Sequence, residues 1–454
     1  MNHYVIVGSG VTGVTALHTL RTMDPSAEIW MVGDDPHGFY SRPGIAYYLN
    51  GEIPENQLPI FSKKDWKMLN VRYVKGVATR LDLQKHLLEI DSSGALKYDR
   101  LLIATGSTAV PLTIPGAGLK GVVKLDDFED TRHILSLARH ANSAVVVGGG
   151  IIAVELVEGL ITRGLKVHYF LRGDRYWPNV LDEKESRLIE HRLVEHGVIL
   201  HHQTEAAEVL GKYGKVVGVR TTTGETIRCQ LVAVGIGVKP RMELAKGAGL
   251  ATERGILTDE TLQTSNPDIF AAGDVSQVHD PQSGKSIIDT LWHPALDKGK
   301  VAAINMTGKR TTYNRKVATN VLRLAGVLTT IIGAVGGGVD DDLVSVARGS
   351  SETWHELPNT ISLECNGDVN HVRLMIGEKT LVGALVMGDQ KLSEPIQEII
   401  SLKVDITPIR NQLKPGSPLG QIIMDFWSEI KPRGKVREEK FIAYPRKQGT
   451  MAVD

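Results

Sequence analysis

Short apolar runs, glycine turns and longer amphipathic stretches follow one another at the start of the chain. Residues 4–7 predict a buried strand, residues 11–23 predict a helix, and residues 28–32 predict a second strand. Two parallel strands need a crossover, which the helix supplies, so this segment predicts a βαβ unit. The same pattern returns with strands at 144–147 and 165–170 on either side of a second helix. The chain therefore contains two such units.

The first unit has the glycine spacing G-x-G-x-x-G at the turn between its strand and its helix, with Gly8, Gly10 and Gly13. The first glycine permits the tight turn, and the second lets backbone N–H groups approach a pyrophosphate. The third lets the helix lie close to the strand. Asp34 follows the second strand, where such units place an acid that binds a ribose hydroxyl. The segment therefore predicts a dinucleotide site.

The second turn carries Gly148 and Gly150, with Ala153 in the place of the third glycine. Similar apolar strands that end near a glycine, at residues 98–107 and 231–240, flank this unit. We therefore expect the second unit to be inserted into the first.

The chain then returns to the first unit through residues 264–275 and a helix at 295–306. From about residue 313, β-prone runs alternate with turns and lead to a helix that starts at Ser393, which predicts a small α+β domain of antiparallel strands. Residues 320–339 are apolar enough to suggest a membrane span, but Arg323 and the glycines favour two strands around a turn at Gly326.

The expected fold is α/β, with two Rossmann-like dinucleotide-binding domains and a C-terminal α+β domain. The expected boundaries are 1–110 with 237–312 for the first domain, 111–236 for the inserted domain, 313–410 for the α+β domain and 411–454 for an extra tail. The tail holds one amphipathic stretch, 419–430, followed by a basic stretch, and we expect it to be a solvated arm over a neighbouring domain.

Composition narrows the function. The 454 residues contain 52 basic and 52 acidic side chains, and this zero net charge argues against a nucleic-acid partner. Cys229 and Cys365 lie far apart and form no C-x-x-C motif, which favours a reducing cytoplasm and no cysteine-based metal site. The histidines form no i, i+4 pair of a helical metal site, so no metal is expected.

The first strand begins within three residues of Met1 and leaves no room for a signal peptide. A soluble, cytoplasmic protein is expected.

Four motifs resemble those of the FAD-dependent pyridine-nucleotide (disulfide) oxidoreductases in order and spacing: VIVGSGVTG, LLIATGS, VVVGGGIIAVE and IFAAGDV. The resemblance covers about residues 1–405 and is greatest to the branch that contains rubredoxin and ferredoxin reductases, NADH oxidases and the flavin portion of nitrite reductase. It implies FAD as cofactor, NAD(P)H as electron donor, and an oxidoreductase that passes a hydride from nicotinamide to flavin.

The resemblance also implies roles for individual residues. Asp274 would bind a ribityl or phosphate oxygen of FAD, Val77 would contact adenine through its main chain, and Arg42 would lie over the flavin. Trp292 and His293 precede a helix whose N-terminus suits the anionic edge of a reduced flavin, and we favour a structural or capping role for His293 over general acid catalysis. The full expected set of FAD and nicotinamide-nucleotide residues is Gly8, Gly10, Val11, Thr12, Gly13, Asp34, Arg42, Val77, Ala104, Thr105, Gly106, Gly148, Gly150, Ile151, Ile152, Glu155, Arg172, Arg175, Gly235, Gly273, Asp274, Trp292 and His293.

Glu155 matches a family glutamate close to the nicotinamide and to flavin N5, and it is the expected catalytic residue. In some relatives this glutamate pairs with a lysine, but Tyr47 stands at that position here. NAD users have an acid at the end of the second strand, whereas this chain has Leu171, followed by Arg172 and Arg175. Because such arginines also follow the acid in NADH users, the choice between NADH and NADPH stays open.

The acceptor is also open. Pro43 lies near the position where the disulfide reductases and the peroxidases of the family carry their cysteine, so thiol chemistry beside the flavin is excluded. A redox protein, a quinone, oxygen or a partner subunit remain as acceptors. The alternatives to a reductase are an NAD(P)H oxidase and a flavoprotein sensor or assembly subunit, which the tail would favour. A homodimer through the C-terminal domain is also considered.

Overall fold

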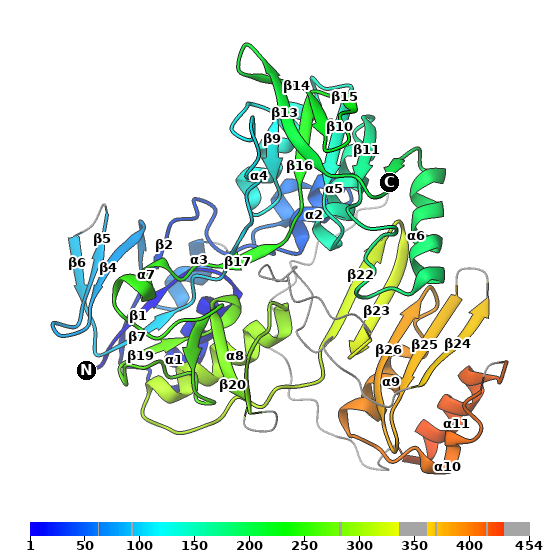
Figure 1. Cartoon of the computed structure of the whole chain (residues 1–454). Coiled ribbons are helices and arrows are strands. Elements are labelled where there is room, and N and C mark those ends of the chain that lie inside the picture. Colours follow the sequence, from blue (N-terminus) through cyan, green and yellow to red (C-terminus); the bar gives the residue numbers. More distant parts are fainter. Residues whose placement is uncertain are drawn as a thin grey trace, which may run out of the picture.

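The computed structural model describes residues 1–61, 63–91, 94–280, 284–335, 361–367, 370–414 and 416–430. Three five-stranded sheets organise these residues into three units (Figure 1). The basic stretch expected beyond residue 430 lies outside the described residues.

The first sheet is parallel and has the order β19-β7-β1-β2-β3. Along β1 the side chains alternate: Tyr4 and Ile6 pack under α1 and α8, while Val5 and Val7 pack against a small sheet and α7. Figure 1 shows α1 and α8 side by side on one face. The elements of this unit are β1 (His3–Val7), α1 (Val11–Met23), β2 (Glu28–Gly33), α2 (Gly44–Asn50), η1 (Glu55–Gln57), α3 (Lys63–Met68), β3 (Arg72–Lys75), β4 (Ala78–Asp82), β5 (Leu87–Ile90), β6 (Gly94–Lys97), β7 (Arg100–Ile103), α7 (Glu243–Gly247), β18 (Ile256–Thr258), β19 (Ile269–Ala271), η2 (Gly273–Val275), β20 (Ser276–Asp280), β21 (Lys285–Ile288) and α8 (Trp292–Met306).

The second sheet is also parallel, with the order β12-β11-β10-β16-β9. Ala144 and Val146 of β10 face α5, whereas Val145 faces the antiparallel strands β13, β14 and β15. The chain enters and leaves this unit through β8 and β17, which pair with each other. Its elements are β8 (Ser107–Ala109), β9 (Val122–Lys124), α4 (Phe128–Ala138), β10 (Ser143–Val147), α5 (Ile151–Thr162), β11 (Lys166–Phe170), α6 (Glu183–Glu195), β12 (Ile199–His201), β13 (Ala206–Lys212), β14 (Lys215–Thr221), β15 (Thr226–Arg228), β16 (Leu231–Val234) and β17 (Val238–Pro240).

The third sheet is antiparallel, with the order β22-β23-β26-β25-β24. One face is covered by α9 and α11, and the other face joins the core formed by α2 and α5. The strands expected around Gly326 form as β22 and β23, and no helix in the described part of the chain is long and apolar enough to cross a membrane. The elements are β22 (Thr319–Leu324), β23 (Val327–Gly333), β24 (Ile361–Gly367), β25 (Asn370–Ile376), β26 (Leu381–Met387), α9 (Ser393–Ser401), α10 (Thr407–Arg410) and α11 (Leu419–Ile430).

The amphipathic stretch of the tail forms α11, and it packs into the third unit instead of lying as a solvated arm. Leu419, Ile423 and Phe426 share one helix face and are buried. The indole N–H of Trp427 donates a hydrogen bond to Glu398 on α9, at 2.5 Å. Residues 419–430 are therefore part of the α+β unit.

Candidate functional site

The first glycine turn is tight at its ends and open in its middle. Gly8 has a φ of +115°, and a Cβ at this position would lie 2.2 Å from the carbonyl oxygen of Ala104. A Cβ at Gly13 would lie 2.0 Å from the carbonyl oxygen of Gly8. At Gly10, by contrast, a Cβ would meet nothing within 4 Å. The turn thus leaves space for a phosphate group at the glycine where the fingerprint requires it.

The N-terminus of α1 faces this open space. Gly10 is its N-cap, no side chain caps the helix, and its first turn has no acid, so the backbone N–H groups can bind an anion. Two further glycines meet the helix at Thr12: a Cβ at Gly273 would lie 2.4 Å from the Thr12 hydroxyl, and one at Gly299 would lie 2.5 Å from its carbonyl oxygen. Close contacts with Thr12 therefore bring η2 and α8 to the turn. Val11 is the first residue of α1 in the same turn.

The residues after β7 and in η2 are joined by hydrogen bonds. The Ser107 hydroxyl donates to the Asp274 carboxylate at 2.7 Å. Thr105 donates its hydroxyl to the carbonyl oxygen of Arg241 at 2.8 Å, and the Arg241 N–H donates to the Gly106 carbonyl at 3.0 Å. Asp274, Thr105 and Gly106 are thereby fixed at the carboxyl edge of the first sheet.

Helix α8 begins at Trp292, three residues before the expected start, and it has no side-chain cap. The indole of Trp292 stacks on Phe39 with ring centroids 6.5 Å apart and an interplanar angle of 15°. His293 is exposed. The N-terminus of α8 thus favours a negatively charged group. A flavin edge at this place stays a prediction.

Two of the expected adenosine contacts differ in their surroundings. Asp34 directly follows β2 and is exposed, so its carboxylate is available to a ribose. Val77 is 47% exposed, and both of its main-chain groups are engaged: its N–H donates to the Asp91 carboxylate at 3.0 Å and its carbonyl accepts from the Asp91 N–H at 3.1 Å. A main-chain contact of Val77 with adenine would compete with these bonds.

Arg42 belongs to an ion cluster that the sequence did not predict. Asp126, which is fully buried, lies 3.5 Å from Arg42, 3.4 Å from Lys124 and 3.3 Å from Arg241, and it accepts a hydrogen bond from the Thr108 hydroxyl at 2.8 Å. The partners come from both sides of the β8–β17 crossing. The cluster therefore ties the first unit to the inserted unit.

The same cluster determines the charge on Arg42. Burial alone would lower the pKa of this guanidinium, but the nearby carboxylates of Asp126 and Asp274 and the Tyr40 hydroxyl outweigh burial and raise it. Arg42 is therefore a fixed cation close to Asp274. Its place over the flavin, which the resemblance implies, stays a prediction.

The second glycine turn is tight at its first glycine, like the first turn, but its open glycine lies between the two glycines of the motif. Gly148 has a φ of +143°, and a Cβ there would lie 2.2 Å from the carbonyl oxygen of Gly235. A Cβ at Gly235 would lie 2.8 Å from the backbone nitrogen of Ala153, so glycine at 235 compensates for alanine in the third position. Gly149 is open, and Gly150 is the uncapped N-cap of α5. Ile151 and Ile152, in the first turn of α5, are buried.

Glu155 is half-buried on α5, close enough to Tyr176 to contribute to the raised pKa of that phenol, after burial and other neighbours. Helix α5 is pressed against α2: a Cβ at Gly159 would lie 2.4 Å from Leu49 Cγ. Tyr47, also on α2, is 39% exposed. The α2–α5 contact sets the position of Glu155 relative to the first unit.

The residues expected to discriminate between nicotinamide nucleotides lie beyond β11. Leu171 is 1% exposed, Arg172 is exposed and Arg175 is half-buried. Cys229 is fully buried in a core of the inserted unit, and burial raises the pKa of its thiol to about 12.

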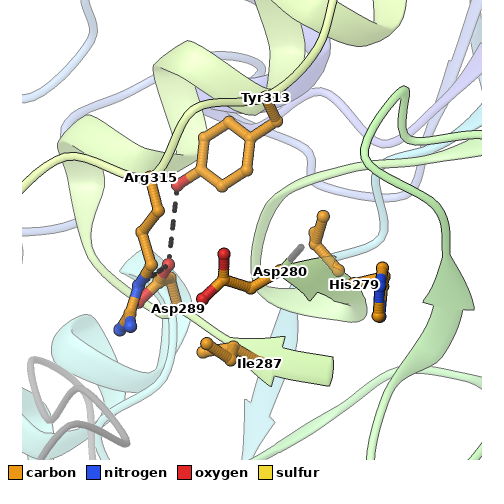
Figure 2. Close-up of a pocket in the computed structure, with 7 residues that line it drawn as sticks. His279, Asp280, Ile287, Asp289, Tyr313 and Arg315 are labelled. Atoms are coloured by element: carbon orange, nitrogen blue, oxygen red, sulfur yellow. Dashed lines mark hydrogen bonds and ion pairs between the residues drawn. The ribbon is translucent and has the colours of Figure 1, made fainter. Parts of the chain in front are cut away.

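A recess beside α8 is lined by charged groups (Figure 2). Arg315 contacts the buried Asp289 with two nitrogens, at 2.9 and 3.1 Å, and Tyr313 lies 3.5 Å from the same carboxylate. Behind it, the fully buried ammonium of Lys298 donates to the carbonyl oxygens of Gly273 and Asp289, at 3.3 and 3.2 Å. This cluster supports η2, and sequence reasoning missed it. Lys298 lies three residues after the buried Ala295 and four residues before the buried Ala302, so it falls on the buried face of α8. This spacing is the sequence signal that could have predicted a buried lysine.

Among the described residues, one trio of potential metal ligands comes together: Asp182, Glu185 and His371. The guanidinium of Arg373 lies 2.9 Å from Glu185 and 3.7 Å from Asp182, and His371 lies 2.8 Å from Glu185. An arginine therefore compensates the carboxylates, and the trio serves as an ion-pair contact between α6 and β25.

Two open dinucleotide turns, each at the carboxyl end of a parallel sheet, define a two-dinucleotide oxidoreductase fold with one nucleotide unit inserted in the other. The family model of the pyridine nucleotide-disulphide oxidoreductases matches residues 2–299. The chain belongs to this family. The homologues bind FAD and take electrons from NAD(P)H, so the membership makes the chain an FAD-binding oxidoreductase.

Individual relatives confirm the resemblance to the reductase branch. The NAD(P)H nitrite reductase of Bacillus subtilis is 25% identical over 406 residues, which are 89% of this chain and 48% of that protein. The ferredoxin–NAD(+) reductase component of the biphenyl dioxygenase system of Paraburkholderia xenovorans is 32% identical over 338 residues, which are 73% of this chain and 81% of that protein. A ferredoxin reductase structure from Rhodopseudomonas palustris superposes with a TM-score of 0.80 at 24% identity, over 92% of this chain and 98% of that one. The chain thus spans about half the length of the nitrite reductase.

Proposed function

We propose that this chain takes a hydride from NAD(P)H onto FAD and passes the electrons to a separate redox protein. The observation that carries the proposal is the pair of turns opened by Gly10 and Gly149, each followed by an uncapped helix N-terminus. FAD, when bound, would accept two electrons as a hydride from the nicotinamide and release them one at a time.

The residues around the first turn fit FAD. The N–H groups at the start of α1 bind the pyrophosphate, the exposed carboxylate of Asp34 binds the adenosine ribose, and Asp274 accepts a hydrogen bond from a ribityl hydroxyl. Arg42 provides a permanent positive charge near the flavin. The N-terminus of α8 at Trp292 favours negative charge on the flavin's edge.

The residues around the second turn fit the nicotinamide nucleotide. The N-terminus of α5, at Gly150, binds its pyrophosphate. Glu155 lies one turn further along the same helix, and we place it beside the nicotinamide, where it orients the ring. The tight packing of Gly159 on Leu49 keeps α5, and with it Glu155, in a fixed relation to the first unit.

A separate acceptor is supported by the placement of the thiols. Helix α2 has no cysteine, and the Cys229 thiol is buried in the second unit with its pKa raised to about 12, which leaves it protonated and unreactive. Cys365 lies in β24 of the third sheet. The relative from Paraburkholderia is named as a ferredoxin–NAD(+) reductase, which supports a small iron–sulfur protein as the acceptor class.

The test is an anaerobic titration of the purified flavoprotein with NADH and NADPH, followed through the flavin absorbance. Rapid bleaching, and then reoxidation by ferredoxin much faster than by oxygen, is the expected result. Bleaching followed by rapid reoxidation with oxygen would indicate that the protein is an oxidase and not a reductase. A flavin that neither nucleotide bleaches would contradict the proposal. The rate of bleaching in the Glu155→Gln variant shows whether the Glu155 carboxylate contributes to hydride transfer.

We also infer a cytoplasmic location, which the free thiol of Cys229 supports.

We infer that the protein forms a homodimer through the third unit. This inference is supported by Val321 and Leu328, which are exposed on the β22–β23 hairpin at the edge of its sheet. Light scattering of the purified protein tests the dimer.

A further inference from the structure

We propose that Lys298 is a positioning residue of the FAD site, and that its buried ammonium holds the peptide between Gly273 and Asp274 in place for the cofactor. The inference rests on the proposed placement of FAD at the first glycine turn, since this placement makes η2 one wall of the cofactor site. Lys298 lies outside the four family motifs of the chain.

The ammonium of Lys298 joins segments that are distant in the sequence. Its side chain is fully buried on α8. Nζ donates to the carbonyl oxygen of Gly273 in η2 at 3.3 Å and to that of Asp289, directly after β21, at 3.2 Å. It also lies 5.8 Å from the ring centroid of Tyr313, in the segment that leads from α8 to the third unit. A fully buried lysine is rare, because protein groups must replace the water around its charge. Its position therefore points to a role for the cation.

The Gly273 carbonyl is held from the interior of the unit. Besides Lys298, the N–H and the hydroxyl of the fully buried Ser276 donate to this carbonyl, the hydroxyl at 2.8 Å. The peptide between Gly273 and Asp274 is trans, so the N–H of Asp274 points away from the Gly273 carbonyl and thus from Lys298. Lys298 therefore helps to fix the direction of this N–H.

The other side of the peptide faces the place expected for FAD. Asp274 is partly exposed, whereas the other two residues of η2 are buried. A Cβ at Gly273 would lie 2.4 Å from the Thr12 hydroxyl, and one at Gly299, the residue after Lys298, would lie 2.5 Å from the Thr12 carbonyl oxygen. Lys298 thus lies where α8 and η2 both press against the first turn of α1, on which the pyrophosphate is placed.

The charge of Lys298 also affects the peptide as a donor. A cation bound to a peptide carbonyl polarises the peptide, so that its N–H binds an oxygen of the cofactor more strongly. A neutral amide at position 298 would keep a donor for the carbonyl but bind it more weakly than an ammonium does. Glutamine and methionine at this position therefore separate a weakened hydrogen bond from a lost one.

Arg315 keeps the Asp289 carboxylate occupied. Its Nη2 and Nε contact the two oxygens of this buried carboxylate, at 2.9 and 3.1 Å, beside the recess (Figure 2). Without the guanidinium, the Asp289 carboxylate would attract the Lys298 ammonium away from the Gly273 carbonyl. Arg315 thus acts on the FAD site through Lys298, although it lies in the segment between α8 and the third unit.

Titration of the apoprotein with FAD, followed through the flavin fluorescence, tests the inference. Lys298→Met should weaken FAD binding roughly 10- to 100-fold, because a hydrogen bond from a charged group is lost. Lys298→Gln should bind FAD roughly 3- to 10-fold more tightly than Lys298→Met. Lys316→Met is the matched control: it removes an exposed lysine that pairs with Asp297 of the same helix at 2.9 Å, and it should bind FAD like the wild type.

A second variant and a second measurement cover the case in which neither Lys298 variant folds. Arg315→Met should weaken FAD binding in the same direction. Hydrogen exchange of residues 269–276 in the apoprotein should be faster in Lys298→Met and Arg315→Met than in Lys316→Met, while the circular dichroism of all three variants stays that of the wild type.

Wild-type affinity for FAD in a folded Lys298→Met protein would overturn the inference, and so would a loss of global stability without a change in affinity. Normal bleaching of the flavin by a nicotinamide nucleotide in that variant would leave the proposed function intact. Weaker FAD binding in the Lys298 variants of a protein whose flavin neither nucleotide bleaches would uphold the positioning role and contradict the proposed function. The two proposals therefore fail separately.

Discussion

A carboxylate of Asp126 lies 3.5 Å from the guanidinium of Arg42, and this contact joins the inserted unit to the side of the first unit where FAD is expected. Asp126 is fully buried, and two of its other partners, Thr108 and Arg241, lie within and directly after the paired strands β8 and β17. Movement of the second unit relative to the first would break this cluster. The contact therefore fixes the position of Arg42 relative to the inserted unit.

Asp126→Asn should destabilise the protein strongly, because it removes the buried negative charge that Arg42, Lys124 and Arg241 share. Removing one partner of a buried ion pair costs about 3–5 kcal/mol. Urea unfolding followed by fluorescence measures the loss. Asp425→Asn, at an exposed position on α11, should change little, and an Asp126 variant as stable as this control would contradict the assigned role.

The first glycine turn allows a separation of folding from FAD binding. Gly8→Ala places a Cβ 2.2 Å from Ala104 at a φ of +115°, so it should disrupt the turn and lower the stability of the apoprotein. Gly10→Ala places its Cβ in open space and should leave the apoprotein as stable as the wild type while it weakens FAD binding. Gly118→Ala, also in open space, is the control for both. Flavin content and thermal unfolding of the apoprotein distinguish the cases.

Normal flavin content in Gly10→Ala would show that no phosphate approaches this glycine. A loss of apoprotein stability in the same variant would show that the turn is tighter than its geometry indicates. Either result would remove the main support for an FAD pyrophosphate at α1.

The contact between α6 and β25 depends on Glu185, whose carboxylate is nearly fully buried. Burial raises the pKa of this group, but His371 and Arg373 outweigh burial and lower it. Glu185→Ala should therefore cost about 3–5 kcal/mol near neutral pH, since it leaves Arg373 buried without its main partner. Because the folded pKa is lowered, the wild-type contribution is present above the unfolded pKa and is lost as the pH falls.

Glu183→Ala, two residues earlier and exposed, is the control for Glu185→Ala. Urea unfolding at neutral and at acidic pH should show a difference between the two variants that narrows in acid. A difference that is constant with pH would mean that packing, and not charge, dominates the effect.

Local patterns were sufficient for the parts of the fold that local chemistry determines. The helix expected at residues 11–23 forms as α1, because the glycine turn and the apolar spacing both specify it. The hairpin at Gly326 follows from a turn between two apolar runs. The family motifs included Gly273 among the expected nucleotide-binding residues, and its close approach to Thr12 of α1 shows why glycine is needed there.

Contacts between distant segments were not predictable in the same way. Arg42, Thr108, Asp126 and Arg241 form one cluster only after the second unit is inserted, and no periodicity relates their positions. The packing of α11 was missed for a related reason: its amphipathic pattern indicates an apolar face but does not name the surface that covers it.

Glu158 connects all three units and should make their association depend on pH. Its carboxylate accepts a hydrogen bond from the Gly326 N–H at 3.1 Å, and Arg323 and Glu52, which pair at 3.1 Å, also face it. Burial, and to a lesser degree Glu52, raise the pKa of Glu158 to about 7, against the opposing effects of Gly326 and Arg323. The folded protein therefore favours the neutral carboxyl, and stability is lost as the pH rises from the unfolded pKa through about 7.

Glu158→Gln keeps the acceptor for the Gly326 N–H and removes the charge. We expect the variant to be more stable than the wild type by up to about 3 kcal/mol at pH 8, and by less than about 1 kcal/mol at pH 5, where the folded wild type is already protonated. Urea unfolding at the two pH values measures the difference, with Glu394→Gln on the exposed face of α9 as control. A variant that is less stable than the wild type at pH 8 would show that the charge on Glu158 is favourable, and that Arg323 outweighs burial at this junction.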